Sequence, residues 1–333
     1  MKHFFIIAIL VVAFTFLLHT GLTDIGLLPK QASLQAVEID KLFNVHIWLI
    51  SVLFSLIIVT LVYSLIVFRR KKGESGDGAY IVGNNRLEIL WTMIPFFLVL
   101  YLAYLGAQSL GIIRQVDTTA MVVHVTAGQW FWKFEYQDSG VTSSTLYLPV
   151  GRQVDLQMTS LDVIHSFWVP EFRVKQDLVP GQTTELRITP DLIGTYHVRC
   201  AELCGTRHAY MEAPVYVVSP QDFYSWIASQ ASTVSQDPVQ RGQLLAQQNG
   251  CSNCHSVSGS AGIGPTWQHL YESQVSLADG STVTADADYL RNSIMTPNLQ
   301  IVKGYYPNVM PDFSSVLKQT EVEDIIAYIQ SLK

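Results

Sequence analysis

The stretch Cys200-Ala-Glu-Leu-Cys204-Gly-Thr-Arg-His208-Ala-Tyr-Met211 decides how this chain can fold. It places two thiols, an imidazole and a thioether close together, a set of soft donors that favours copper over hard cations. A further imidazole, His165, occurs upstream in SLDVIHSFWVPEF (160–172). One histidine from an earlier strand, combined with a Cys/His/Met loop between two late strands, is the layout of a blue-copper β-sandwich.

Two cysteines stand in this loop where a blue-copper site has one. Two thiolates four residues apart can both bridge a pair of coppers, with one histidine on each metal and with Met211 and a backbone carbonyl as weak outer ligands. The pattern therefore predicts a binuclear copper centre. Two alternatives stay open: a tetrahedral zinc site built from the two cysteines and two histidines, and a disulfide between Cys200 and Cys204 in an oxidising compartment.

The residues around this loop predict an all-β domain. From Ala120 to about Val218, segments such as MVVHVTAGQWFWKFEY, QVDLQMTS, TTELRITP and APVYVVSP are rich in β-branched and aromatic residues and are separated by Pro and Gly. Short strands with turn signals every few residues are typical of a β-sandwich or Greek-key barrel. We therefore expect a cupredoxin-like domain over 118–220.

The composition indicates a membrane protein. The chain has 333 residues, of which 49% are hydrophobic, and most of the strongly apolar sequence precedes Leu110. The net charge is −6, and the only dense basic cluster is Arg69-Arg70-Lys71-Lys72. This charge pattern excludes a nucleic-acid-binding protein.

Two apolar segments, Val45–Phe68 and Ile89–Leu110, are long enough to cross a bilayer and predict a transmembrane hairpin over 40–114. The basic cluster between them places their connection in the cytoplasm and everything after the second helix outside. The shorter run Phe4–Leu18 suits the core of a signal peptide, or a retained N-terminal hydrophobic helix, within 1–22.

A second metal-binding motif follows the β-rich region. Cys251-Ser-Asn-Cys254-His255 is the c-type haem attachment sequence, in which two thioethers anchor the porphyrin and the adjacent His is an axial ligand. GIGPTW (262–267) follows it, and YYPNVMPDF (305–313) supplies Met310. His/Met ligation raises the reduction potential and suits electron transfer.

The chain after the β-rich region becomes helical. A short helix and a polar linker, Ala231–Asp237, fill 221–238 and precede a small all-α domain over 239–333. The C-terminal segment TEVEDIIAYIQSL has the spacing of an amphipathic helix, and Thr320 with Glu323 predicts a capping box at its start.

The motifs DVIHSFWVPEFRVKQDLVPGQTTE, CAELCGTRHAYM and AGQWFWKFEY resemble those of cytochrome c oxidase subunit II over roughly 40–220. The resemblance implies that the backbone carbonyl of Glu202 is a copper ligand, and that its side chain reaches a magnesium at the boundary with subunit I. It implies that electrons enter at Trp130 and that Glu88, in LEILWTMIP, lies at the mouth of a proton channel. The resulting copper ligand set is His165, Cys200, Glu202, Cys204, His208 and Met211.

The region Val239–Lys333 resembles class I cytochrome c. That resemblance implies that Met310, followed by Pro, is the sixth iron ligand and that the carbonyl of Pro265 orients the axial His255. Met295, in SIMTPN, is the rival methionine.

Together the resemblances imply a caa-type oxidase subunit II in a bacterial plasma membrane, with copper and haem domains on the periplasmic side. Electrons would pass from haem c to copper and to the haem of subunit I for reduction of oxygen to water coupled to proton translocation. Subunit III is an expected partner, and a quinol:cytochrome c reductase or a small electron carrier is the expected donor. The alternatives are a subunit of a nitric oxide reductase, a membrane-anchored electron shuttle and a structural zinc module.

Overall fold

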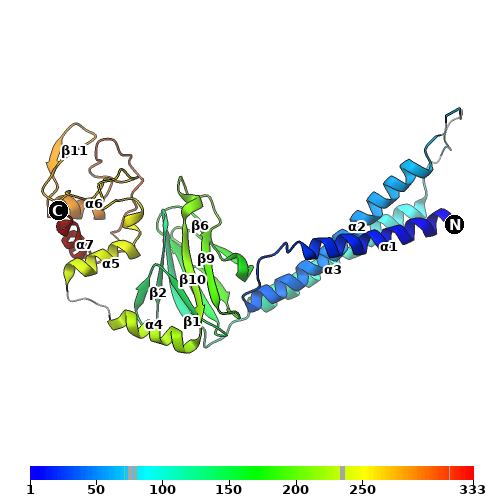
Figure 1. Ribbon diagram of the computed structural model, residues 1–333, viewed down its shortest axis with the longest axis horizontal. Coiled ribbons are helices and arrows are strands. Elements are labelled where there is room, and N and C mark those ends of the chain that lie inside the picture. Colours follow the sequence, from blue (N-terminus) through cyan, green and yellow to red (C-terminus); the bar gives the residue numbers. More distant parts are fainter. Residues whose placement is uncertain (71, 74–77, 79, 81, 233–236, 315) are drawn as a thin grey trace. The chain divides into compact units, whose positions relative to one another are not determined.

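The computed structural model describes residues 1–70, 72–73, 78, 80, 82–232, 237–314 and 316–333. They form two compact units, one of Met1–Gln31 with Gln35–Gln115 and one of Ala32–Leu34 with Val116–Lys333. Figure 1 traces the chain through both units from its N-terminus to its C-terminus.

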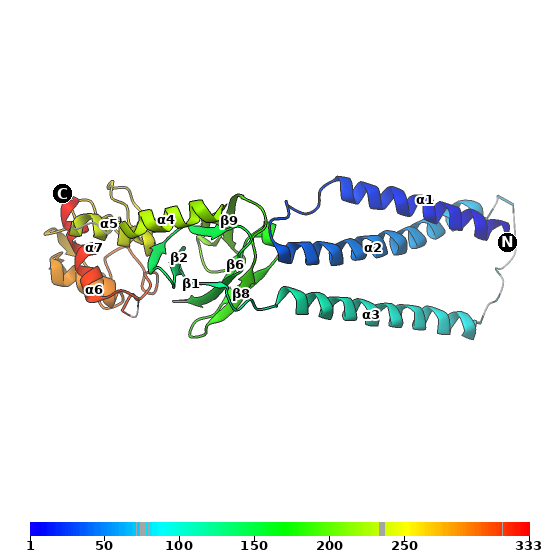
Figure 2. The same ribbon diagram turned by 90° about the horizontal axis from the view of Figure 1, so that it is seen from below.

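The first unit contains three helices that are long and apolar enough to cross a membrane: α1 (Lys2–Asp24), α2 (Leu34–Val67) and α3 (Asn85–Ile113) (Figure 2). The prediction of two spans is therefore corrected to three candidate spans. The apolar run predicted at the N-terminus continues in both directions into α1. This helix has 23 residues; at about 1.5 Å per residue, that length is enough for a hydrocarbon core of about 30 Å. Removal of α1 as a signal remains a prediction.

Aromatic side chains join α1 to α2. The ring of Trp48 stacks on His19 with centroids 3.7 Å apart and meets Phe16 edge-on at 5.6 Å. Nearer the other end of α1, His3 Nδ1 lies 2.7 Å from the hydroxyl of Tyr63. These contacts pair the start of α1 with the end of α2, so the two helices run antiparallel.

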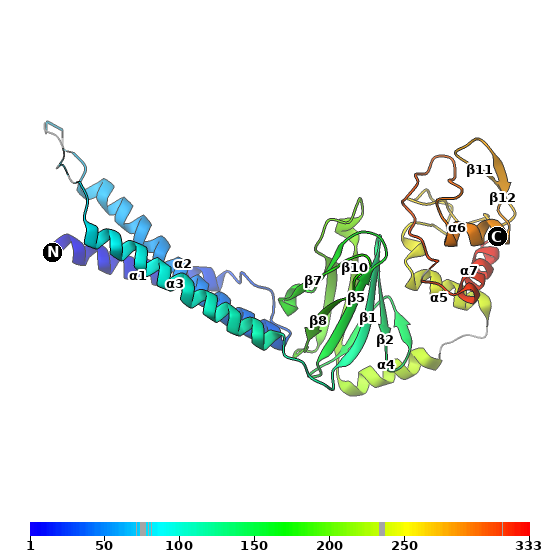
Figure 3. The same ribbon diagram turned by 180° about the vertical axis from the view of Figure 1, so that it is seen from behind.

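The β-rich region folds as predicted into a sandwich of two five-stranded sheets, with strand orders β3-β2-β1-β5-β8 and β4-β10-β9-β6-β7 (Figures 1 and 3). The strands are β1 (Met121–Gly128), β2 (Phe131–Tyr136), β3 (Val141–Ser143), β4 (Leu146–Pro149), β5 (Val154–Ser160), β6 (His165–Trp168), β7 (Lys175–Leu178), β8 (Thr184–Ile188), β9 (Gly194–Cys200) and β10 (Glu212–Val218). Alternate residues are buried along β5 and β10. This period of two directs one face of each sheet into a shared apolar core.

The segment MVVHVTAGQWFWKFEY forms two strands and the turn between them. β1 and β2 pair antiparallel, and Gly128 lies opposite Phe131. The turn therefore consists of Gln129 and Trp130 alone, at the tip of the β1–β2 hairpin.

A short segment before α2 docks on the sandwich, a feature that the sequence pattern does not predict. The backbone N–H of Ala32 donates to the carbonyl of Glu171 at 3.1 Å, and the N–H of Leu34 donates to Thr189 at 3.0 Å. The backbone N–H of Asp191 donates to the carbonyl of Ala32 at 3.2 Å. Ala32 is fully buried in the sandwich core.

The helix α4 (Pro220–Ser232) is attached to the edge of the sandwich by aromatic stacking. Trp226 stacks on Tyr147 with ring centroids 4.1 Å apart. The hydroxyl of Tyr136 donates to the carbonyl of Tyr147 at 3.0 Å and accepts from its N–H at 2.7 Å. The predicted linker overlaps the end of α4, and its residues 233–236 lie outside the described residues.

The C-terminal region contains helices α5 (Pro238–Gln248), α6 (Ala287–Met295) and α7 (Gln319–Ser331). It also has a small antiparallel hairpin, β11 (Gln274–Ser276) with β12 (Thr282–Thr284), so the expectation of an all-α domain needs this addition. Helices α5 and α7 cross closely at Gly242, where a Cβ would lie 1.8 Å from the carbonyl oxygen of Asp324.

The predicted amphipathic spacing of α7 is confirmed, since apolar residues at helical spacing are buried along it: Val322, Ile325, Ile326 and Ile329. The predicted capping box is wrong. The helix begins earlier, at Gln319, and the carboxylate of Glu321 accepts from the N–H of Lys318 at 2.7 Å. Glu323 instead forms an ion pair with Arg291, with 2.8 Å between Oε1 and Nε.

Candidate metal centres

Pairing between two strands brings together the distant parts of the predicted copper site. His165 is the first residue of β6, and Cys200 is the last residue of β9. These strands pair antiparallel, with Phe167 opposite Cys200. The loop that follows turns through a short 3-10 helix at His208–Tyr210 and returns along β10, which pairs with β9. Both ends of the loop are thus fixed in one sheet.

The four strong donors lie within a few ångströms of one another. The Sγ atoms of Cys200 and Cys204 are 3.7 Å apart. Nδ1 of His165 lies 3.8 Å from the first of these sulfurs, and Nδ1 of His208 lies 3.5 Å from the second. Metal–thiolate bonds are about 2.3 Å long, so a metal on either side of the sulfur pair could contact both thiolates.

Two weaker donors complete the cluster. Sδ of Met211 lies 3.7 Å from Sγ of Cys204, and the carbonyl oxygen of Glu202 lies 3.2 Å from Sγ of Cys200. The structure therefore brings together all six residues of the predicted copper ligand set. The side chain of Glu202 itself is exposed, and no described contact links it to a further cation site.

The donor set favours copper over the two alternatives. A disulfide requires sulfurs about 2.05 Å apart, whereas both thiols are free and separated. Two cysteines and two histidines would satisfy zinc, but zinc has no use for the nearly buried thioether of Met211. Thioether and thiolate together are donors that copper prefers.

Neighbouring groups hold His165 in one orientation. Oδ1 of Asp162 lies 2.8 Å from its Nε2, which leaves Nδ1 facing the thiols. Burial alone would lower the pKa of His165, but the hydrogen bonds with Asp162 and Cys200 outweigh it and raise that pKa. The other carboxylate oxygen of Asp162 accepts from the N–H of Gln129 at 2.7 Å. The same carboxylate therefore connects the copper site to the β1–β2 turn.

The two thiols differ in acidity because they share one small site. Burial raises the pKa of Cys200, but the hydrogen bond from His165 and nearby backbone groups outweigh it and lower that pKa below its ordinary value. Burial and the charge on Cys200 raise the pKa of Cys204. The second thiol will therefore ionise fully only when a cation replaces its proton.

Trp130 forms a hydrogen bond with the copper loop. Its indole N–H donates to the carbonyl of Cys204 at 3.0 Å, and the side-chain amide of Gln129 donates to the same oxygen at 2.7 Å. Gly205 has a φ of +112°, and a Cβ there would lie 3.0 Å from the indole ring. A glycine is thus required where the loop passes Trp130, and sequence analysis did not identify the role of Gln129.

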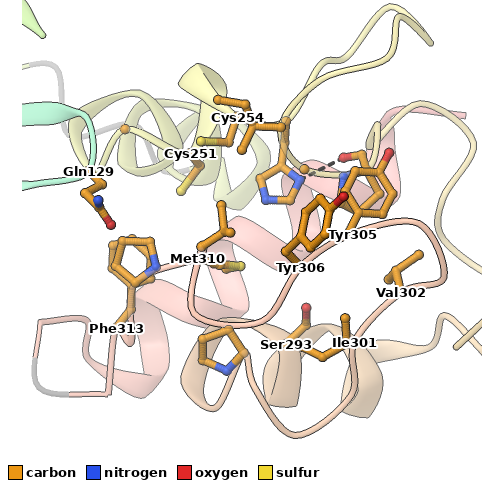
Figure 4. A pocket seen from close by; sticks show the side chains of 18 of the residues that line it. Gln129, Cys251, Cys254, Ser293, Ile301, Val302, Tyr305, Tyr306, Met310 and Phe313 are labelled. Carbon is orange, nitrogen blue, oxygen red and sulfur yellow. Dashed lines mark hydrogen bonds between the residues drawn. The ribbon is translucent and has the colours of Figure 1, made fainter. Parts of the chain in front are cut away.

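The haem motif lies at the wall of a pocket whose empty volume is about 780 Å³ (Figure 4). Cys251 begins a short 3-10 turn, Cys254 follows it, and both line the pocket with His255. Met310 lines the same pocket from the loop before α7, whereas Met295, the last residue of α6, is not among the residues that line it. The placement therefore favours Met310 over its rival.

The backbone around GIGPTW orients His255. Its Nδ1 lies 2.7 Å from the carbonyl oxygen of Pro265, and its ring stacks on Trp267 at 5.1 Å. A Cβ at Gly264 would lie 2.6 Å from the imidazole ring, so only glycine fits there. Burial lowers the pKa of His255, which keeps the ring neutral and able to bind a metal.

Glu88 lies in the first turn of α3. Its Oε1 accepts from the N–H of Asn84 at 3.3 Å, while the side chain of Asn84 accepts from Leu87 at the same distance. This arrangement caps the helix. Within the described residues, no second titratable group forms a hydrogen bond or an ion pair with Glu88, so a role in proton uptake remains a prediction.

Comparisons with known proteins cover nearly the whole chain. Residues 20–110 match the family described as cytochrome c oxidase subunit II, transmembrane domain, residues 140–219 match its periplasmic domain, and residues 239–333 match cytochrome c. A cytochrome c oxidase subunit 2 of Alkalihalophilus pseudofirmus is 30% identical over 325 residues, which cover 92% of this chain and 90% of that protein.

Other relatives match part of the chain. A cytochrome c oxidase subunit 2 of Thermostichus vulcanus is 35% identical over 255 residues, with 60% of this chain and 77% of that protein covered. The crystal structure of the periplasmic domain of subunit II of cytochrome oxidase of Bradyrhizobium japonicum is 28% identical, with a TM-score of 0.35 and coverage of 36% of this chain and 100% of that chain.

Proposed function

The chain belongs to the cytochrome c oxidase subunit II family, and we propose that it passes electrons from a covalent haem c to a binuclear copper centre and on to the haem of subunit I. It is a subunit of a haem-copper oxidase, anchored in a bacterial membrane with a periplasmic domain. Subunit I is its partner. The reduction of oxygen to water takes place outside this chain.

The observation that carries the proposal is the convergence of six donors from two remote segments on one point. His165, Cys200 and Cys204 have donor atoms that all lie within 4.8 Å of one another, and the second imidazole, the thioether and the carbonyl extend this group. Only residues of this sandwich supply the set, so the copper pair would need no ligand from another subunit.

The haem pocket fits a c-type haem because the groups that would hold the haem also converge there. Two cysteines and a neutral, oriented His255 line one side, and Met310 enters from another. When bound, the haem iron and the copper pair would each gain and lose one electron, a chemistry that side chains alone do not provide. The chain's residues hold the donors in fixed orientations and keep water away from the thiols, of which Cys204 is 2% exposed.

The wider reaction needs partners that this chain implies only through its family. We propose subunit III as a further partner and a quinol:cytochrome c reductase or a small electron carrier as donor. The side chain of Glu202 would reach a magnesium shared with subunit I, and Glu88 would lie at the cytoplasmic mouth of a proton channel that couples oxygen reduction to proton translocation.

Metal analysis of the full-length subunit in detergent tests the proposal. We expect two coppers and one low-spin haem per chain, and a mixed-valence copper signal in the electron paramagnetic resonance spectrum. The Cys204→Ser variant should lose that signal and keep the haem spectrum, because the two sites lie in separate domains. An unchanged copper signal in this variant would refute the bridging assignment.

A further inference from the structure

The haem attachment loop contacts the copper-binding domain within one compact unit of the structure. Asn253 stands between the two haem cysteines, and its side-chain amide donates to the carbonyl of Trp130 at 2.9 Å. Arg207, from the copper loop, donates to the carbonyl oxygen of Asn253. The indole of Trp130 in turn donates to Cys204. A continuous series of hydrogen-bonded groups therefore joins the two metal-binding loops.

Phe131, the residue after Trp130, enters the haem domain. It is 6% exposed and belongs to the apolar cluster of that domain, although its backbone is part of β2. A Cβ at Gly250 would lie 2.5 Å from the Cβ of Phe131, and Gly250 has a φ of +71°. The ring also lies 6.4 Å from Phe313 in a stacked arrangement. Gly250 thus provides both the turn before the haem motif and the space for Phe131.

Polar contacts surround this aromatic contact. Nζ of Lys133 donates to Oδ1 of Asn249 at 3.2 Å, and the side-chain amide of Gln248 donates to the carbonyl of Thr142 at 2.7 Å. Burial lowers the pKa of Lys133, as expected for an ammonium group partly removed from water. An apolar centre with a polar rim is the composition of a specific protein interface.

We propose that Phe131 and Asn253 are positioning residues that dock the haem domain on the copper domain of the same chain, with Asn253 joining the haem loop to Trp130. This inference rests on the proposed function, in which electrons enter the copper domain at Trp130. In the docked state Trp130 is 7% exposed. A soluble electron donor therefore delivers its electron to the haem domain and has no direct access to Trp130.

Two variants and one control of the full-length subunit in detergent test the docking. Asn253→Ala removes the bond to Trp130, and Phe131→Ala removes the apolar anchor. Gln274→Ala is the control, because its amide bonds to Thr284 at 2.9 Å within the β11–β12 hairpin. The first readout is the rate at which an amine-acylating reagent modifies Lys133, measured by mass spectrometry with exposed Lys175 as internal reference. The second is the rate of haem-to-copper electron transfer after flash photoreduction of the haem.

We expect Asn253→Ala to slow electron transfer about fivefold, the factor that corresponds to one net hydrogen bond. Phe131→Ala should slow it about thirtyfold, as for a central aromatic anchor of an interface. Both variants should increase the acylation of Lys133, and the control should match the unmodified chain in both measurements.

The possible failures are distinguishable. If the unmodified chain transfers electrons and both variants match it in transfer rate and in acylation of Lys133, the docking inference is wrong and the proposed function stands. If photoreduced haem in the unmodified chain never reduces copper, the proposed function itself fails and the inference fails with it. Copper and haem content, measured on each variant, identifies any variant that has lost a metal site. If Phe131→Ala misfolds, Asn253→Ala alone decides whether the docking inference is correct.

Discussion

At the scale of single residues, His165 and His255 use opposite ring nitrogens for the contacts that orient them. His165 contacts Asp162 through Nε2 and presents Nδ1 to the thiols, whereas His255 contacts the carbonyl of Pro265 through Nδ1. The sequence identifies both histidines and Pro265 through their motifs. It does not indicate which nitrogen faces the metal, because that depends on the side-chain rotamer and on a hydrogen-bond partner fixed only by the fold.

Asp162 should control the copper affinity through this contact. In Asp162→Asn the charge that supports His165 is lost while the side-chain shape is kept, so we expect copper affinity to fall by about 10- to 100-fold. Competition with a copper chelator, followed by the absorbance of the copper site, measures the change. Asp279→Asn, in the turn of the β11–β12 hairpin, is the control. Equal copper affinity in the two variants would show that Asp162 does not support the ligand.

At the scale of elements, the predictions that rest on the periodicity of apolar residues are confirmed. The prediction of where a helix begins is wrong. The sandwich and the stripe of α7 follow from burial of every second or every third to fourth side chain, which a sequence displays directly. The start of α7 at Gln319 and the two-residue turn at Trp130 depend on competition between neighbouring caps and turns, which local pattern does not resolve. The contact of Ala32 with the sandwich joins segments that are far apart in sequence, and no periodic pattern predicts it.

The crossing of α5 and α7 should depend on Gly242. Its replacement in Gly242→Ala forces a methyl group against the backbone of Asp324, and we expect the haem domain to lose about 1–3 kcal/mol of unfolding free energy. Thermal unfolding monitored by haem absorbance measures this loss. Gln243→Ala, at the next and exposed position of α5, should unfold at the temperature of the unmodified chain. A Gly242→Ala variant as stable as this control would contradict the close crossing.

At the scale of the whole molecule, the kinds of domain could be predicted from sequence, because apolar helices, a β-sandwich and a cytochrome c domain each have their own motif or hydropathy. The number of candidate spans could not, since a short apolar run near the N-terminus has the composition of a cleaved signal and of a helix alike. The structure extends that run into α1 and gives it ring contacts with α2.

The basic cluster after α2, Arg69-Arg70-Lys71-Lys72, predicts the topology of the chain. A phosphatase that is active only outside the cytoplasm should be inactive when it is fused after Gly73 and active when it is fused after Lys333. The phosphatase activity of each fusion, normalised to its protein level by immunoblot, distinguishes the two positions. The reverse pattern would invert the assignment of every domain after α3.

The attachment of α4 to the sandwich through Trp226 fixes where the connection to the haem domain starts. From Ser232 to the first residue of α5, Pro238, the chain can extend by only about 20 Å. The copper-binding and haem-binding domains are therefore made as one polypeptide, with one of each per chain. Under the proposed function, a cell that makes more of this subunit would make the immediate reductant of its copper centre at the same time, and a damaged covalent haem would be renewed only by replacing the whole polypeptide.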